Sequence, residues 1–427
     1  MRQKNYSYIC QIDCLRNHMS STLYWIIIAI VLADFIFGIW LQILSIRASK
    51  NAIPKSLAGL YDETEYARQQ SYFRVNHRMA FITSSLTSMI LLAFFAFGGI
   101  AWLDSVARGF SANMVLQALC YFGILYLVSF LLSLPFSVYG TFVVEEKFGF
   151  NKTTPGLFAG DTVKNFLMEA VLTGGLLAIA VWVYSLNPQW FWLIAWGVFA
   201  AVLLFLQYFY SELIVPLFNR QMPLEEGELR STIEAFAAKA GFELENIFVM
   251  DASKRSTTAN AYFTGFGKKK RVVLFDTLIE QLTTDEIVGV LAHEIGHYKR
   301  GHLLKDIVST LITTLATFWL FSLFIDNEAI ASAAGCAEPS FWVNLTVFAM
   351  LLSPVQLALG IVTNAISRRH EHQADAFAKE YGYGPAEASG LKKISSQALS
   401  NLTPHPVVVF IEHSHPPLAD RVEFLEG

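Results

Sequence analysis

The sequence predicts a mainly α-helical membrane protein with seven transmembrane helices and a cytoplasmic α+β domain. Composition is the first observation behind this prediction: the 427 residues are 54% hydrophobic and 15% charged, with a mean hydropathy of +0.43. Soluble proteins typically carry about a quarter of their residues as Asp, Glu, Lys or Arg. The net charge of −4 and the pI near 6.2 also argue against a nucleic-acid partner.

Seven apolar stretches are the second observation. Each one reaches the length of about 20 residues that a helix needs to cross a bilayer. They lie near residues 22–45, 79–103, 114–136, 168–186, 190–214, 303–325 and 341–366. Asp34 lies inside the first stretch, where a charged side chain is costly. It is expected either to line a water-filled space or to pair with another span.

The basic residues of the loops are the third observation. The first, third and fifth loops are rich in Lys and Arg, and the loops between them are poor. Cytoplasmic loops of membrane proteins carry this excess. We therefore expect loops one, three and five and the C-terminus in the cytoplasm, and the N-terminus outside. Arg2, Lys4 and Arg16, which precede the first span, oppose only the last of these assignments.

The N-terminal segment is not expected to be a cleavable signal peptide. Its apolar run is too long, and no small-residue cleavage site follows it. The four cysteines of the chain have neither zinc-finger nor redox spacing. Cys10 and Cys14 are expected as free thiols, with a disulfide between them as the alternative if this end faces an oxidising compartment.

The fifth loop, roughly 215–302, is long enough for a small folded unit. Its residues 247–250, 260–266 and 271–276 are predicted as strands, with a turn at 267–270 between the last two. Thr283 and Glu286 follow in the spacing of a capping box, in which two side chains satisfy backbone N–H groups at the start of a helix. The sequence therefore predicts a helix over 287–298 that follows directly on the strands.

The predicted helix carries the pattern of a metal site, His293-Glu294-Ile295-Gly296-His297. Two histidines at i and i+4 lie one turn apart on one helix face, so both can bind a single ion. Glu294 is rotated off that line and can reach a water on the metal. Zinc hydrolases need this set of groups: a Lewis acid, a water that it acidifies and a base beside them. His302 is out of register with the pair and is expected to be structural.

A catalytic zinc site needs a third protein ligand, with the fourth position left for water. Segment 367–377 follows the seventh span, and an antiparallel pair of spans returns it to the face that the metal-binding helix left. Glu371 is the expected third ligand, with His370 and His372 as alternatives. Asp375, one turn later, is expected to accept a hydrogen bond from a ligating imidazole. The competing interpretation of this segment is a juxtamembrane polar cap.

A third histidine-rich motif lies at 413–421, near the C-terminus. His415, held before two prolines, is placed to donate a hydrogen bond to the oxyanion of a tetrahedral intermediate. Arg421 is placed to pair with a nearby carboxylate. An ordinary surface turn would show much the same pattern.

These segments divide the chain into four predicted parts. Residues 1–218 form an N-terminal transmembrane region with five spans, and 219–302 form a cytoplasmic subdomain with the metal-binding helix. Residues 303–366 form a transmembrane hairpin of two spans. Residues 367–427 form a cytoplasmic part that completes the metal site.

Taken together, the motifs resemble those of the type 1 CAAX prenyl proteases, a family of integral-membrane zinc metalloendopeptidases. Five motifs in order along the chain carry the resemblance, and it covers nearly the whole chain, up to Arg421. The motifs are EEKFGFNKT at 145–153, NAYFTGF at 260–266, HEIGH at 293–297, SRRHEHQADAFA at 367–378 and HSHPP at 413–417.

The resemblance implies a specific catalytic site. One Zn²⁺ per chain would be held by His293, His297 and Glu371, with Glu294 as the general base. Asp375 would support the ligands or donate a proton. The family fold consists of seven tilted helices enclosing a hydrated chamber, capped by the cytoplasmic zinc metallopeptidase domain.

The resemblance also implies how a substrate binds. His415 and Arg421 would line the cleft near the oxyanion. Asn260, Ala261, Tyr262 and Phe263 would form an edge strand to which an extended peptide adds, a common mode of peptide recognition. The short loops, with no retention signal after Gly427, fit a bacterial member in the inner membrane, and bacteria generally do not prenylate proteins. The sequence leaves open whether prenylation matters.

The sequence-based hypothesis is a membrane-embedded zinc metalloendopeptidase that hydrolyses peptide bonds with metal-activated water and resembles enzymes that remove a C-terminal CAAX tripeptide. Its expected partners are a peptide or protein substrate, prenylated or membrane-associated, and the lipid bilayer, with no nucleic acid. A quality-control zinc peptidase acting on damaged membrane proteins is the nearer alternative. A non-catalytic transporter or scaffold with a structural metal site is the remote one.

Overall fold

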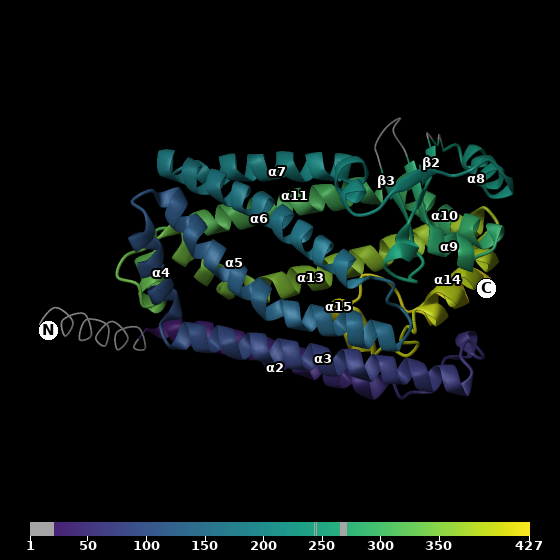
Figure 1. Cartoon of the computed structure of the whole chain (residues 1–427), viewed down its shortest axis with the longest axis horizontal. Helices are drawn as coiled ribbons and strands as arrows, with labels where there is room; N and C mark the ends of the chain where they lie inside the picture. The colour runs from purple at the N-terminus through teal and green to yellow at the C-terminus, as the bar shows by residue number, and fades with distance from the viewer. Residues whose placement is uncertain (1–20, 243, 245, 265–270) are drawn as a thin grey trace, which may run out of the picture.

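The computed structural model describes residues 21–242, 244, 246–264 and 271–427. The molecule is elongated: long helices run along its length, and a small sheet with short helices lies at one end (Figure 1). The Cys10–Cys14 pair, the basic residues before the first span and the turn at 267–270 lie outside the described residues.

The helices fall into two groups along the chain. The membrane region contains α2 (Thr22–Ala48), α3 (Glu63–Ala96), α4 (Gly99–Phe110), α5 (Met114–Tyr139), α6 (Pro155–Leu186), α7 (Phe191–Phe209), α11 (His302–Ser322), α12 (Glu328–Ala333) and α13 (Phe341–Glu380). The sheet end contains α8 (Glu228–Lys239), α9 (Asp276–Gln281), α10 (Thr284–Lys299), α14 (Gly384–Gln397), α15 (Pro406–Glu412) and α16 (Leu418–Glu426).

Within the described residues, seven helices are long and apolar enough to cross a membrane, as predicted. Their ends differ from the predicted spans in two informative ways. The predicted span 79–103 breaks at Gly98, whose φ of 73° is a left-handed conformation that ends a helix, and α4 starts there as a separate element. At its other end, α3 extends back to Glu63, because Asp62 and Glu65 form a capping box. Neither the left-handed glycine nor the capping box can be recognised from hydropathy.

The spanning helices are packed loosely along their length. Only 6–17% of the residues in their most apolar windows are buried. Because a packed bundle would bury one face of each helix, this low share indicates helices arranged around an open interior, and it agrees with the expected chamber. The end away from the sheet is closed by an apolar cluster that includes Ile100, Leu103 and Trp342. Asp34 lies 2.5 Å from the Ser353 hydroxyl of α13, so it has a partner on another span.

The sheet has the strand order β1-β2-β4-β3. The strands are β1 (Gln221–Pro223), β2 (Asn246–Met250), β3 (Ala261–Thr264) and β4 (Arg271–Phe275). The three predicted strands are present, and β1 is an addition. β2 and β4 run parallel, with Ile247 opposite Val272, and β3 pairs antiparallel with β4. On its other side β3 has no strand neighbour among the described residues, so it is an edge strand as expected.

The helix α10 begins as the capping box predicts. Thr283 accepts a hydrogen bond from the Glu286 backbone, and the Glu286 carboxylate accepts one from the Thr283 N–H. The helix packs closely on α13 and α14. A Cβ atom at Gly296 would lie 3.0 Å from Phe377 Cβ, and one at Gly289 would lie 2.7 Å from the Glu387 backbone nitrogen. These two glycines let the three helices approach one another.

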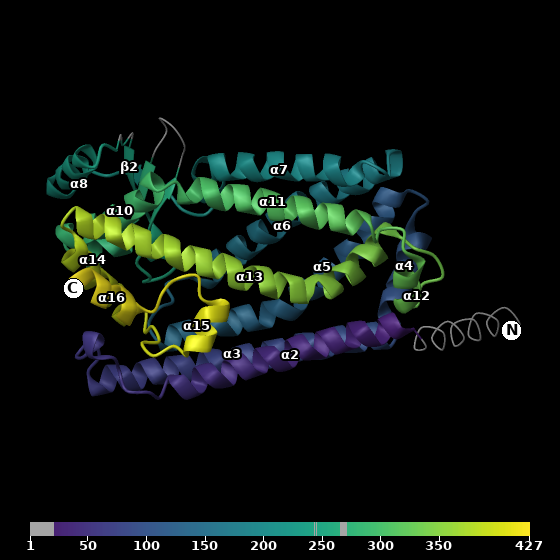
Figure 2. The ribbon, with the colours of Figure 1, turned by 180° about the vertical axis from the view of Figure 1, so that it is seen from behind.

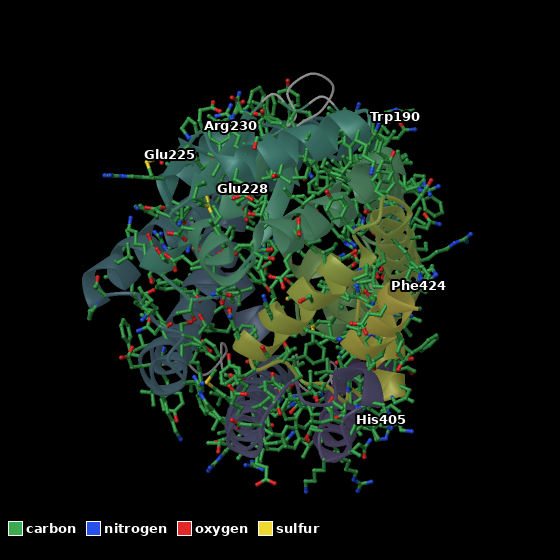
Figure 3. The ribbon with its side chains drawn as sticks, turned by 90° about the vertical axis from the view of Figure 1, so that its right-hand side faces the viewer. Trp190, Glu225, Glu228, Arg230, His405 and Phe424 are labelled. Carbon is green, nitrogen blue, oxygen red and sulfur yellow. The ribbon has the colours of Figure 1, made fainter. Side chains whose placement is uncertain are left out.

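The C-terminal helices complete the sheet end. Figure 2 shows α14, α15 and α16 between α13 and the pair α2 and α3. Seen from the sheet end, Glu228 and Arg230 of α8 lie on one side of the molecule, and Phe424 of α16 lies on the other (Figure 3). The chain therefore returns from the membrane along α13, packs α14 against α10, and packs α16 against α14.

The contact at Gly289 generates a stability prediction. Gly289→Ala should lower the free energy of unfolding by about 1–3 kcal/mol, because the added methyl group overlaps the α14 backbone. The measurement is thermal unfolding of the purified protein in detergent. Gly175→Ala is the control: its Cβ meets nothing within 4 Å, and Ala in a helix should be neutral or stabilising by up to about 1 kcal/mol. Equal melting temperatures for the two variants would show that the contact is not tight.

Candidate active site

The structure brings two histidines of α10 and one carboxylate of α13 to a common point. His293 Nε2 and His297 Nε2 lie 3.0 Å apart. Glu371 Oε2 is 3.5 Å from the first of these nitrogens, and its Oε1 is 3.2 Å from the second. The separation of these residues along the chain is bridged because α13 is a single continuous helix that carries both the seventh span and segment 367–377.

The alternative ligands His370 and His372 point elsewhere. The ring of His370 stacks on that of His302 with centroids 4.0 Å apart, and its Nδ1 lies 3.5 Å from Asp306. The ring of His372 packs against Phe424 at 4.1 Å. Of the three candidates, only Glu371 faces the two histidines of α10. Arg368 in the same segment donates to the backbone oxygens of Val409 and His413, at the end of α15.

His302 holds the outer side of His297. Its Nδ1 lies 3.0 Å from His297 Nδ1, and its Nε2 lies 2.9 Å from Gln373 Oε1. The side chain is 1% exposed. His302 is therefore structural, as expected, and its specific role is to orient the ring of His297.

Two carboxylates and one guanidinium surround His293 on the side away from the cluster. Its Nδ1 lies 2.7 Å from Asp375 Oδ1 and 3.0 Å from Glu387 Oε1. The Arg421 guanidinium donates to both Asp375 oxygens, at 2.6 and 3.0 Å, and to Glu387 Oε1 at 3.0 Å. Its Nη1 lies 3.5 Å from Glu371. Arg421 therefore pairs with carboxylates, as its position in the sequence suggested.

For each of His293, Glu387 and Arg421, burial and the neighbouring charged groups shift the pKa in opposite directions. Burial alone lowers the pKa of the His293 imidazole, but hydrogen bonds with the neighbouring carboxylates raise it well above its usual range. Burial raises the pKa of Glu387 to about 7, although His293 opposes that rise. Burial also opposes the charge on Arg421, but hydrogen bonding to Asp375 raises the pKa of this arginine. The carboxylates thus create a place for positive charge at His293.

The residues at this point fit a divalent metal ion. The ligand atoms of His293, His297 and Glu371 all lie within 4.8 Å of one another. Two imidazole nitrogens and a carboxylate oxygen form a common donor set for catalytic zinc. Glu371 Oε2 is buried and has no hydrogen-bond partner, which is costly unless a cation is bound. Asp375 and Glu387 can also gather around His293 in a second group, but Arg421 already occupies both carboxylates.

A cavity of about 420 Å³ opens on this cluster. Among the predicted site residues, the following line it: Asn260, Ala261, His293, Glu294, His297, Glu371, His415 and Arg421. His415 lies at the mouth, with its Nε2 3.5 Å from Glu371 and its side chain 63% exposed. The structure therefore assembles the three histidine-containing motifs in one cleft beside the edge strand.

Three predicted site residues are not part of the cavity wall. Asp375 is 1% exposed and lies behind His293. The hydroxyl of Tyr262 lies near Ser211 and Gln221, on the far side of the strand. The ring of Phe263 packs on Phe242 and Tyr298. Along β3, only the backbone can contact a ligand at these last two positions.

Glu387 is the functional-site residue that the sequence did not reveal. It is 1% exposed and touches both His293 and Arg421. Its neighbours in the chain, Pro385-Ala386-Glu387-Ala388-Ser389-Gly390, show no ligand spacing. The only local signal is the run of small residues, which allows α14 to approach α10 at Gly289.

Two family profiles cover most of the chain. The profile described as CAAX prenyl protease N-terminal, five membrane helices, matches residues 42–220. The profile of peptidase family M48 matches residues 223–427, which include the whole cluster of α10, α13 and α14.

Individual relatives match over nearly their full length. A CAAX prenyl protease 1 homolog of Oryza sativa subsp. japonica is 34% identical over 94% of this chain and 96% of its own length. CAAX prenyl protease 1 of Saccharomyces cerevisiae is 33% identical over 89% of this chain and 90% of its own. The crystal structure of Ste24p of S. mikatae superposes with a TM-score of 0.89 at 32% identity, covering 95% of this chain and 99% of that one.

The buried charge network generates the second prediction. Arg421→Ala should lower the free energy of unfolding by about 3–5 kcal/mol, because it leaves Asp375 and Glu387 buried without a guanidinium partner. Thermal unfolding of the metal-free protein in detergent measures this.

The control for that prediction is Arg300→Ala. Arg300 faces Glu380 at 4.0 Å, and both side chains are exposed, so the change should be below about 1 kcal/mol. If both arginine variants unfolded at the same temperature, the buried network would not contribute the stability assigned to it.

Proposed function

We propose that this chain, which belongs to the CAAX prenyl protease branch of peptidase family M48, uses zinc to cleave the C-terminal tripeptide from CAAX-type substrates. Family membership makes it a multi-pass membrane metalloendopeptidase that acts on peptide or protein substrates. The observation that carries the proposal is the meeting of Glu294 and the three-residue donor set in one cavity beside the free edge of β3. Membership in a peptidase family favours an enzyme over the non-catalytic transporter or scaffold.

In this proposal His293, His297 and Glu371 hold one Zn²⁺ per chain. When bound, the ion supplies Lewis acidity that lowers the pKa of a water in the open fourth position. Asp375 holds the Nδ1–H of His293, so that Nε2 faces the metal. In the same way, His302 Nδ1 holds the Nδ1–H of His297, so that His297 Nε2 faces the metal. Because Asp375 is behind His293 and not in the cavity wall, its role is positioning and not proton donation.

Glu294 acts as the general base. It lies in the cavity wall, on the same helix as the two histidines but off their line. Its carboxylate takes a proton from the attacking water and delivers that proton to the leaving amine nitrogen. A positioned general base of this kind contributes about 10²–10⁴-fold to the rate.

The substrate peptide lies along β3 as an added strand. The free edge of this strand offers backbone N–H and C=O groups, and Asn260 and Ala261 face the cavity. His415 lies at the cavity mouth and donates a hydrogen bond to the carbonyl oxygen as it becomes an oxyanion. Tyr262 and Phe263 contribute their backbone to the strand, and their side chains hold it against the rest of the domain.

The site is proposed to face the cytoplasm, with the N-terminus outside. The basic residues of the first, third and fifth loops support this orientation. The sheet end of the molecule carries the active site, so it would lie at the cytoplasmic face (Figure 1). Location in a bacterial inner membrane stays a prediction, and the curated relatives named above are eukaryotic.

Peptide cleavage tests this function directly. The purified protein should release the terminal tripeptide from a farnesylated CAAX peptide, and a metal chelator should stop the reaction. Glu294→Gln should lower kcat by about 10³-fold or more while leaving the metal content unchanged, because the ligands remain. Mass spectrometry of the products and metal analysis of the protein are the measurements. Full activity in Glu294→Gln would remove the assignment of the base.

Metal affinity tests the third ligand independently of cleavage. Glu371→Gln should weaken zinc binding by more than about 100-fold, because it removes the anionic donor from the cluster. His372→Gln changes the next residue on the same helix, whose ring packs on Phe424, and should bind zinc as the wild type does. Competition with a chromogenic chelator gives both affinities. A larger loss in His372→Gln than in Glu371→Gln would reverse the ligand assignment.

A further inference from the structure

The membrane region contains a second cavity, away from the metal site. Its volume is about 860 Å³, and its walls are α3, the start of α4, α5 and the π-helical turn Gly140–Glu145 that continues α5. We call it the α3–α5 groove. Along α3 its lining runs from Asn76 to Phe94, a length of about 27 Å at the rise of an α-helix. The groove is therefore long and narrow.

The groove lies where two helices diverge. α3 packs mainly on α2 and α4, and α5 mainly on α4 and α6. Figure 1 shows α3 and α5 meeting at the sheet end and separating toward α4, which joins them at the other end. Both helices belong to the membrane spans. The groove between them therefore lies at the depth of the membrane spans.

The walls favour an apolar ligand. Most of the lining is Leu, Ile, Phe, Val and Met, with Trp102 and Leu103 at the α4 end. The hydroxyls of Thr83, Ser133 and Ser137 donate to backbone oxygens of their own helices and so need no ligand. Hydrocarbon chains bind such walls through burial of their surface alone.

One charge marks the end of the groove nearer the sheet. Among the described residues that line it, Glu145 is the only ionisable one, and it accepts a hydrogen bond from the Tyr72 hydroxyl at 2.7 Å. A phospholipid would place its phosphate near this carboxylate, where like charges repel. An isoprenyl chain is uncharged and meets no such repulsion in the groove.

The same end leads into the peptidase domain. Directly after Glu145, Phe148 and Phe150 pack on the ring of Tyr72 at 4.9 and 5.1 Å. The next residues bond to the segment that precedes β3: Lys152 N–H donates to Arg255, Thr257 N–H donates to Phe150, and Asn151 pairs with Ser256. The groove and the substrate strand are thus joined by one short, hydrogen-bonded turn, which is the EEKFGFNKT motif.

We propose that the α3–α5 groove binds the isoprenyl chain of a lipid-modified substrate while its peptide lies along β3. This inference rests on the proposed function and adds the place where the lipid is recognised. The apolar walls, the carboxylate of Glu145 and the lack of a cation among the described lining residues select a hydrocarbon chain without a phosphate. The turn from Glu145 to Thr153 sets the position of the groove relative to the strand, so lipid and scissile bond are bound together.

Photo-crosslinking tests the location. The probe is a CAAX peptide with a photoreactive isoprenyl group, bound to full-length Glu294→Gln protein in nanodiscs so that it is not cleaved. Cross-links should map to α3 and α5 residues that line the groove, and excess farnesylated peptide should remove them. Cross-links that map elsewhere, or that only phospholipid displaces, would overturn the proposal, the latter in favour of a bilayer lipid.

A pair of adjacent leucines tests the consequence for specificity. Leu132 lines the groove, whereas Leu131 is 56% exposed and does not. Leu132→Trp fills part of the groove and should reduce the ratio of kcat/KM for farnesylated over unmodified peptide by at least about tenfold. Leu131→Trp adds the same ring outside the groove and should keep the wild-type ratio. Equal ratios in the two variants would overturn the proposal.

The two experiments separate this inference from the proposed function. If the wild type cleaves neither peptide, the CAAX function fails, and the cross-links still decide whether a prenyl chain binds the groove. If the wild type cleaves both peptides but cross-links map outside the groove, the function stands and the lipid site is wrong.

Discussion

The close approach of α10 to α13 and α14 holds the whole active site together. At Gly296 and Gly289 there is no room for a side chain, and the contacts of 2.7–3.0 Å that a Cβ would make show how near the backbones lie. This approach sets His293 and His297 against Glu371, and it places Glu387 behind them. A larger residue at either glycine would push the helices apart and so displace the donor atoms from one another.

The packing buries several carboxylates close together, and a metal ion would balance their charge. Glu371, Asp375 and Glu387 are buried around His293, and Arg421 is the one guanidinium among them in the described structure. Buried carboxylates are stable only with cationic partners. When His293 is neutral, as a metal ligand must be, these carboxylates outnumber the one guanidinium, and a divalent cation at Glu371 would balance them while Arg421 retains Asp375 and Glu387. The same charges that orient the imidazoles also favour the ion.

The membrane helices are packed less closely than the helices of the peptidase domain. They are packed at the α4 end and against the C-terminal helices, and they leave space between, including the α3–α5 groove. Tyr72, Phe148 and Phe150 close one end of that space and connect it to the residues before β3. A lipid-bearing substrate could therefore be held at two places by one continuous piece of structure.

The features that depend on local spacing could be predicted from the sequence alone. The i, i+4 histidines, the Thr283 capping box, the seven apolar spans and three of the four strands follow from periodicity and side-chain chemistry, and the structure has them near the predicted positions. The sequence named Glu371 ahead of His370 and His372, and the folded structure shows that it faces the two histidines of α10. The folded structure was needed to show that Tyr262 and Phe263 lie outside the cavity wall and that Glu387 belongs to the site. It also showed the break at Gly98 and the groove beyond it. These features depend on helices far apart in the chain packing together, and no local pattern encodes the distance at which two such helices meet.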